Sequence, residues 1–375
     1  MKTLIKNARV VLPDCSGYKN ADVLIENGKI SALGGDFTAE RVINASGKYL
    51  LPGLIDIHNH GSVGAFFGGD NHEKILDFLA KKGITTVLPT LGVQSIEILE
   101  ERIEKILELK NKKTNATRIG GIHLEGPFIS AEKKGAMVLD SVDCTLQNFN
   151  RLIDAGKGEI KLMAIAPERG NALDVIKEGV KRGVRMSLGH TMATYDEAIK
   201  AIKAGANHAT HTFNAMRSYN HREPGVLGAV LTEASVSCEV ICDMVHLHPT
   251  TIELIRRTKG IDKMIFISDS VMITGLPDGE YVYDGQIRIV KNGISRTKDG
   301  VIAGSCFTMA DSAKKLLNFG YSIADIARIG SLNPAQAVGL EKEVGTIEAG
   351  KSADILICDN RLNIEQIILG GETIL

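Results

Sequence analysis

Six residues whose side chains can bind a metal ion or transfer a proton stand at the ends of short apolar segments. They are His58, His60, Glu125, His190, His211 and Asp269. Imidazole nitrogens and carboxylate oxygens, without thiolates, form the donor sets of hydrolytic zinc and iron sites, and ligand type alone does not choose between these metals. The residue types therefore indicate hydrolysis assisted by a divalent metal ion.

The spacing of the first two histidines supports this interpretation. In a strand, residues two apart point to the same side, so His58 and His60 would face one ion while Asn59 turns away. A single histidine at a strand end is more often a hydrogen-bonded residue than a ligand. Six such residues at the ends of five predicted strands favour one common site.

Other histidines differ from this group in their sequence context. His123 precedes Glu125 by two residues and is expected to lie behind the ligands. His208 has the opposite strand parity to His211, and His72 lies in a charged helical context that predicts exposure to solvent. None of the three is a predicted ligand.

The six residues form one site only if the segments that carry them end on a common face. The expected strands are 54–60, 85–91, 119–126, 161–168, 185–190, 208–213, 237–243 and 264–269. Helical patterns, with apolar residues three and four apart, include 72–83, 95–110, 172–183 and 194–205. Eight strands, most of them followed by a helical pattern, predict an α/β fold, a closed (β/α)₈ TIM barrel with its catalytic residues at the carboxyl ends of the strands.

The two ends of the chain have a different residue pattern from the middle. Residues 1–50 contain short β-branched runs divided by turn signals such as Asn-Gly, and residues 341–375 resemble them. We therefore expect a small β-sandwich domain built from both termini, and a catalytic barrel over 51–340.

Composition limits the classes of partner. The 375 residues are 44% hydrophobic and 24% charged, and 44 basic residues nearly cancel 45 acidic ones. No overall field would recruit nucleic acid or an anionic membrane, so neither is an expected partner. The six cysteines are scattered, as is typical of reduced thiols, and no segment has the roughly 18 uncharged apolar residues of a membrane helix. A cytoplasmic protein is expected.

Motifs along nearly the whole chain resemble those of one known family. They are PGLIDIHNHG, GIHLEGPFIS, SLGHT, HTFNAM, HREPGVLGA, DMVHLHP, ISDS and GTIEAGKSADI. Together they are similar to the N-acetylglucosamine-6-phosphate deacetylases of the amidohydrolase superfamily. The resemblance implies an amidohydrolase-type barrel that hydrolyses the acetamide of N-acetyl-D-glucosamine 6-phosphate to D-glucosamine 6-phosphate and acetate, in amino sugar catabolism.

The resemblance also implies a metal set. Glu125, His190 and His211 match the residues that hold one ion in this family. Members with an intact His-x-His pair add a second ion, so His58 and His60 favour two ions, zinc or iron, with Glu125 bridging them. The aspartate after the eighth strand, Asp269, would be the catalytic acid and base and a further metal ligand.

For the substrate, the resemblance points to positions spread over the second half of the chain and one loop before it. They are Ala136, Asn214, Ala215, Arg222, His246, Ile302, Ala303 and Gly304. Arg222 would grip the phosphate across the interface of a homodimer, a role that suits the planar fork of an arginine. The ordinary alternative for Arg222 is a surface ion pair with Glu223.

Two departures from the family pattern bear on the substrate. Met137 stands where the family usually has a histidine, and Ser270 where it usually has an alanine. If that histidine polarises the amide carbonyl, Met137 removes a donor, and another group must stabilise the oxyanion. Three alternatives stay open: N-acetylgalactosamine 6-phosphate as substrate, another N-acyl amino compound, and a catalytically silent barrel that binds a ligand.

Overall fold

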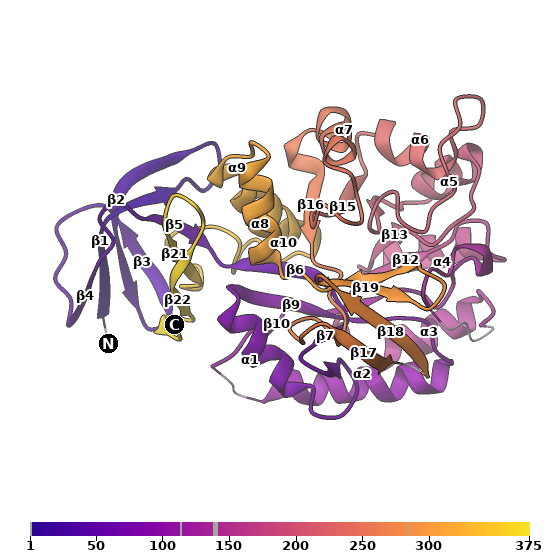
Figure 1. Ribbon diagram of the computed structural model, residues 1–375, viewed down its shortest axis with the longest axis horizontal. Coiled ribbons are helices and arrows are strands. Elements are labelled where there is room, and N and C mark those ends of the chain that lie inside the picture. Colours follow the sequence, from indigo (N-terminus) through magenta and orange to yellow (C-terminus); the bar gives the residue numbers. More distant parts are fainter. Residues whose placement is uncertain (1, 113–114, 138–141, 284) are drawn as a thin grey trace.

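Parallel strands arranged in a ring form the largest part of the protein (Figure 1). The computed structural model describes residues 2–112, 115–137, 142–283 and 285–375. The strands of the ring are β6 (Leu54–Asn59), β9 (Ile84–Leu91), β11 (Ile122–Leu124), β12 (Ile160–Ile165), β13 (Arg185–Leu188), β14 (His208–Ala209), β15 (Ser237–Ile241) and β16 (Met264–Ile267). Each pairs in parallel with the next, from β6 to β16.

Backbone hydrogen bonds at the carboxyl ends of β6 and β16 close the ring. The Asp269 amide donates to the His58 carbonyl at 3.0 Å, and the His60 amide donates to the Ser270 carbonyl at 2.8 Å. These four residues belong to two of the predicted site segments, so ring closure itself brings those segments together. The predicted barrel fold is confirmed.

The predicted strands differ from the observed ones in two places. The segment 119–126 contains two strands, β11 and the shorter β10 (Arg118–Ile119), because Gly121 has a φ of 154° between them. The segment 208–213 contains only the two residues of β14. It ends early because His211 has a φ of 27°, which is outside the extended region.

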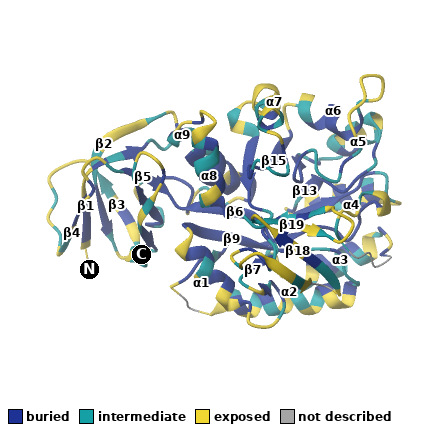
Figure 2. Ribbon diagram, viewed as in Figure 1, coloured by how far each residue is buried: buried dark blue, intermediate teal, exposed yellow. Residues whose placement is uncertain are grey.

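Helices surround the ring and turn their apolar faces toward it (Figure 2). They are α1 (Glu73–Lys81), α2 (Ile96–Asn111), α3 (Leu146–Ala155), α4 (Ala172–Lys181), α5 (Tyr195–Lys203), α6 (Gly225–Thr232), α7 (Pro249–Lys259), α8 (Met309–Asn318), α9 (Ile323–Ala327) and α10 (Asn333–Ala337). In α2, Leu99, Ile103 and Ile106 are buried at spacings of four and three, while the Ser95 hydroxyl caps the first turn. Among the described residues, no helix has the length and apolar character that crossing a membrane requires.

A separate sheet joins both ends of the described chain, on the left of Figure 1. Its strands are β1 (Lys2–Val11), β2 (Tyr18–Glu26), β3 (Lys29–Leu33), β4 (Arg41–Asn44), β5 (Tyr49–Pro52), β21 (Ile355–Cys358), β22 (Ile364–Leu369) and β23 (Glu372–Thr373). It has a hydrophobic core of its own, in which Val23, Leu50 and Ile355 are buried. The domain boundaries at residues 50 and 341 stay a prediction.

A third, antiparallel sheet interrupts the barrel after its last strand. It consists of β17 (Gly279–Tyr283), β18 (Gln286–Lys291), β19 (Ile294–Thr297) and β20 (Ile302–Ser305), and a two-stranded ribbon, β7 (Gly61–Ser62) with β8 (Ala65–Phe66), follows β6. The prediction of a barrel over 51–340 did not single out these strands. Asn292-Gly293 lies between β18 and β19, and this dipeptide between β-branched runs is a strong hairpin signal. We call β17–β20 the cap sheet.

Candidate active site

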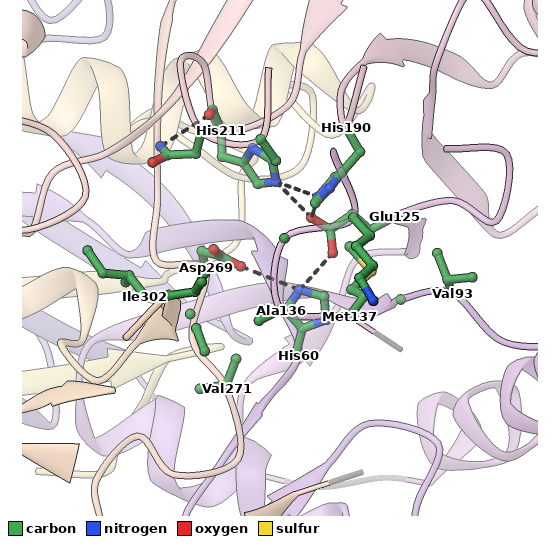
Figure 3. A pocket seen from close by; sticks show the side chains of 18 of the residues that line it. His60, Val93, Glu125, Ala136, Met137, His190, His211, Asp269, Val271 and Ile302 are labelled. Carbon is green, nitrogen blue, oxygen red and sulfur yellow. Dashed lines mark hydrogen bonds and ion pairs between the residues drawn. The ribbon is translucent and has the colours of Figure 1, made fainter. Parts of the chain in front are cut away.

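The side chains at the carboxyl ends of the barrel strands converge on Glu125 (Figure 3). Its Oε1 lies 3.0 Å from His190 Nε2 and 2.9 Å from His211 Nε2, and its Oε2 lies 3.1 Å from His60 Nε2. His58 Nε2 is 3.3 Å from Glu125 Oε1. One carboxylate therefore contacts all four predicted histidines, which is the arrangement of a bridging ligand.

Asp269 lies on the other side of the first histidine pair. Its Oδ1 is 3.4 Å from His60 Nε2 and 3.5 Å from His58 Nε2. All six predicted chemical residues thus form one cluster. Asp269 contacts this pair and also lines the open space in front of it.

Three residues of the cluster owe their direction to an uncommon backbone conformation. His190, His211 and Asp269 have φ values of 47°, 27° and 51°, in or near the left-handed region that residues with a Cβ rarely adopt. A hydrogen bond of the main chain holds each of them: the Ser130 amide donates to the His190 carbonyl at 2.8 Å, the His211 amide to Glu239 Oε2 at 3.1 Å, and the Asp269 amide to the His58 carbonyl at 3.0 Å. The surrounding structure thus imposes this strained geometry.

The charges of the cluster stabilise one another. Burial, the largest single effect, would raise the pKa of Glu125, but the positive charges of His58, His190 and His60 outweigh it and hold the pKa well below its usual range. Burial also disfavours the charged form of His60, yet Glu125 and Asp269 raise its pKa to about 9. The carboxylates are thus ionised, and a divalent cation bound between them and the imidazole nitrogens would displace the protons of the imidazoles.

The donor atoms fit a metal ion better than a hydrogen-bond network. Two imidazole nitrogens, His190 Nε2 and His211 Nε2, face each other at 2.9 Å. The Nδ1–H of His190 donates to the Lys133 carbonyl at 2.6 Å, so Nε2 is the ring nitrogen left to bind an ion. His58 Nε2 is buried and has no hydrogen-bond partner among the described residues. The sets Glu125–His190–His211 and His58–His60–Glu125 each place their ligand atoms within 4.8 Å of one another.

A cavity of about 970 Å³ opens in front of the cluster. Seven of the eight residues predicted to bind substrate line it, namely Ala136, Asn214, Ala215, His246, Ile302, Ala303 and Gly304. The last three belong to β20, so the cap sheet forms one wall of the cavity. The opposite side carries Val93 and Met137, and Figure 3 shows Met137 beside Glu125.

Hydrogen bonds fix two of these lining residues. The Nδ1–H of His246 donates to Asp243 Oδ2 at 2.8 Å, and the Ser305 hydroxyl donates to the same oxygen at 3.0 Å. The Asn214 side-chain amide donates to the His211 carbonyl at 3.2 Å. Burial would raise the pKa of Asp243, but its bond to His246 and the positive charge of that imidazole lower the pKa to about 2.

Arg222 is the predicted substrate residue that does not line the cavity of this chain. It is exposed, and its Nη1 lies 2.8 Å from His221 Nε2. The Glu223 carboxylate accepts instead from the backbone amides of Tyr195 and Gly225, at 2.9 and 3.1 Å. The predicted phosphate contact across a dimer interface requires that Arg222 lie outside the cavity of its own chain.

The structure adds residues that the sequence analysis did not single out. Arg288 and Arg296 of the cap sheet line the cavity, and Glu239 is buried beside His58. Glu239 could have been found from the sequence, because a glutamate in the middle of the apolar strand SCEVICD is rarely buried without a partner. The expectation for His72 was wrong: it is 8% exposed, because its Nδ1 accepts from the Gly68 amide just before α1.

Comparisons with known proteins give consistent results. Residues 49–374 match the model of the amidohydrolase family. An N-acetylglucosamine-6-phosphate deacetylase of Bacillus subtilis is 33% identical over 98% of this chain and 96% of its own length. An N-acetylgalactosamine-6-phosphate deacetylase of Escherichia coli O157:H7 is 28% identical over 99% of both chains.

Solved structures agree with these relatives. A mutant N-acetyl-D-glucosamine-6-phosphate deacetylase from Mycobacterium smegmatis, in complex with N-acetyl-D-glucosamine-6-phosphate, superposes with a TM-score of 0.90. It is 30% identical, and the match covers 100% of this chain and 99% of that one. The likeness therefore includes the barrel, the cap sheet and the terminal sheet.

Proposed function

Since the chain belongs to the amidohydrolase family and, within it, is related over its whole length to amino sugar phosphate deacetylases, we propose that it hydrolyses the acetamide of N-acetyl-D-glucosamine 6-phosphate. The products are D-glucosamine 6-phosphate and acetate. The observation that carries this function is the cluster in which Glu125 contacts four histidines beside Asp269, in a cavity that holds the predicted sugar-binding residues.

The reaction depends on a divalent metal ion. Bound by Glu125, His190 and His211, and at a second position by His58 and His60, such ions would lower the pKa of water from about 15.7 to about 7 and act as Lewis acids on the amide carbonyl. Two ions, zinc or iron, are the proposed complement, because both ligand sets are complete.

Asp269 is the proposed proton carrier. Burial would raise its pKa, but the hydrogen bond to His60 and the charge of His58 hold the pKa below its usual value, so the carboxylate is ionised at neutral pH. It takes a proton from the attacking water and returns it to the sugar nitrogen as the C–N bond breaks. One residue thus serves first as base and then as acid.

The cavity walls hold the sugar phosphate. His246, Asn214, Ala215 and the β20 backbone are placed around the sugar, and Arg222 of a second subunit binds the phosphate. Met137 supplies no donor to the amide carbonyl, so polarising that carbonyl would fall to the ions that Glu125 and the four histidines would hold. A homodimer and a cytoplasmic location stay predictions.

Acetate release from a panel of substrates, combined with metal analysis, tests the proposal. The panel contains N-acetylglucosamine 6-phosphate, its galactosamine isomer, unphosphorylated N-acetylglucosamine and an N-acetyl amino acid. We expect the highest kcat/KM with the first compound and two ions per subunit. Faster hydrolysis of the galactosamine isomer would change the substrate and keep the chemistry, whereas protein that binds no metal and releases no acetate would refute the function.

A further inference from the structure

A continuous line of buried hydrogen bonds runs behind the metal centre, away from the cavity. It joins Arg185 at the start of β13, His208 on β14, Glu239 on β15 and His58 on β6. His58, His208 and Glu239 are each 0% exposed. None of the reaction steps proposed above uses Arg185, His208 or Glu239. Their polar side chains in the barrel interior therefore need a different explanation.

The direction of each hydrogen bond in this line is fixed by chemistry. Arg185 Nε can only donate, and it lies 3.0 Å from His208 Nδ1, which must therefore accept. Neutral His208 then carries its proton on Nε2, which donates to Glu239 Oε1 at 3.0 Å. Burial, the largest effect, lowers the pKa of His208 and favours this neutral form.

The other oxygen of Glu239 reaches the metal centre at two points. Glu239 Oε2 lies 3.0 Å from His58 Nδ1 and accepts from the His211 amide at 3.1 Å. Both oxygens of Glu239 thus accept an N–H group, Oε1 from His208 and Oε2 from the His211 amide, so Glu239 acts as an acceptor toward His58 as well. His58 then donates from Nδ1, which leaves Nε2, the ring nitrogen that faces Glu125 and Asp269, as the atom that can bind an ion.

We propose that Glu239 is a positioning residue, which fixes the tautomer of His58 and the backbone of His211 so that both present Nε2 to the metal ions. Arg185, at the opposite end of the barrel, determines this tautomer indirectly, because it holds His208 as a donor to Glu239. The inference rests on the proposed metal centre and adds to it residues that bind no ion. Partners of this kind orient ligands, and their loss weakens metal binding by about 10- to 100-fold.

The same atoms do not form a third metal site. The ligand atoms of His58, His123 and Glu239 lie within 4.8 Å of one another. Both oxygens of Glu239 already accept N–H groups, however, and His58 Nδ1 is one of the donors. His123 Nδ1 lies 3.3 Å from the Thr90 hydroxyl, and its ring stands nearly perpendicular to that of His58, so it packs against the ligand.

Glu239→Gln is a sharp test because an amide has one acceptor and one donor end. His208 is held as a donor by Arg185, so the glutamine oxygen must face His208 and its NH₂ group must face His58. His58 then becomes an acceptor at Nδ1, carries its proton on Nε2 and can no longer bind the ion there. Glu108→Gln, an exposed position on α2, is the matched control.

Zinc content at buffered free zinc concentrations gives the main measurement. Wild type and Glu108→Gln should take up two ions, and the double variant His58→Asn with His60→Asn should take up one. Glu239→Gln should take up its second ion only at about 10- to 100-fold higher free zinc, and the first ion with a smaller change. Wild-type uptake of both ions by Glu239→Gln would overturn the positioning role.

A second measurement needs no Glu239 variant. In zinc-loaded wild type with ¹⁵N-labelled histidines, His58 should show a hydrogen-bonded Nδ1–H signal that is absent in His58→Asn. A His58 proton on Nε2 would contradict the inference. If wild-type protein binds no ion at all, the proposed function fails, whereas two ions with the wrong His58 tautomer refute only the role of Glu239.

Discussion

At the scale of single residues, the site depends on carboxylates that are buried yet ionised. Glu125, Asp269 and Glu239 each lie among histidines, and these partners hold the three pKa values below the usual range against the effect of burial. A buried carboxylate without such partners would be neutral. The residues are therefore interdependent, and removing one changes the charge state of its neighbours.

Asp269→Asn should separate catalysis from metal binding. The amide keeps the shape of the side chain but cannot take a proton from water, so kcat should fall by about 100-fold or more. The thermal unfolding temperature and the content of the Glu125–His190–His211 ion should stay close to wild type. Near-normal turnover would remove Asp269 from its role as proton carrier.

Asp243 makes stability depend on pH in a specific range. Its pKa is about 2 in the folded protein against 3.8 for the ordinary group, so the carboxylate stabilises the fold above about pH 4, and this contribution is lost as the pH falls through about 2. Asp243→Asn should lower the free energy of unfolding by about 2 kcal/mol at pH 7 and by much less near pH 2.

Urea unfolding at pH 7 and at pH 2.5 would measure this difference. The exposed Asp299→Asn serves as control and should change neither value. A loss for Asp243→Asn that is as large at pH 2.5 as at pH 7 would show that packing, and not the charge, accounts for it.

At the scale of elements, the cap sheet turns an open barrel end into a cavity. Its last strand, β20, lies against the loop that carries Asp269: the Ser305 amide donates to the Asp269 carbonyl at 2.9 Å. Gly304 has a φ of 69°, and a Cβ there would stand 2.2 Å from Val271 Cγ1. The sheet and the catalytic loop therefore fit only without a side chain at this position.

Gly304→Ala should displace Val271 and the neighbouring Asp269. We expect kcat to fall by as much as about 100-fold, because small displacements of a catalytic group are that costly. Gly300→Ala is the matched control: its φ is 84°, but no atom lies within 4 Å of the added Cβ. It shares the backbone strain without the clash and should keep most of kcat. Equal losses in both variants would exclude the steric explanation.

The sequence predicted these elements unevenly, for physical reasons. Hydrophobic segments at regular intervals located all eight barrel strands, since each strand is buried on both faces. The left-handed backbone at His211 could not be foreseen, because it is imposed by contacts with Glu239 and not by local propensity. The cap sheet was missed although its Asn-Gly turn is a hairpin signal, because the region was taken as part of the barrel.

At the scale of the whole molecule, the proposed homodimer would complete each active site with a residue from the other chain. The cavity of one chain contains residues proposed to bind the sugar and the metal ions, while Arg222 lies outside it. Most oligomers of this size are symmetric dimers, so each chain would receive the arginine of the other. The proposed phosphate contact thus makes a monomer incomplete.

Arg222→Ala should raise KM for the phosphorylated sugar, with little effect on the unphosphorylated one. Arg257→Ala, an exposed position on α7, controls for the loss of one surface charge. At substrate concentrations far below the KM of Arg222→Ala, where neither variant alone is active, mixing Arg222→Ala with Asp269→Asn should restore activity, because hybrid dimers contain one complete site. Random mixing makes half of the dimers hybrid, each with one working site of two, so about a quarter of wild-type activity should return. If the subunits exchange and activity does not return, Arg222 acts on the site of its own chain.

The terminal sheet has a consequence for how the protein is made. Strand β5 is flanked on one side by β1 and on the other by β21, with Leu50 opposite Ile357. A ribosome synthesises some three hundred residues between β5 and β21. Strands β1–β5 therefore leave the ribosome early, and the edge of β5 that pairs with β21 stays unpaired while the barrel is translated. The sheet is completed only after β21 has left the exit tunnel. A stalled or truncated chain would carry that open edge, the feature by which quality control could tell it from a finished molecule.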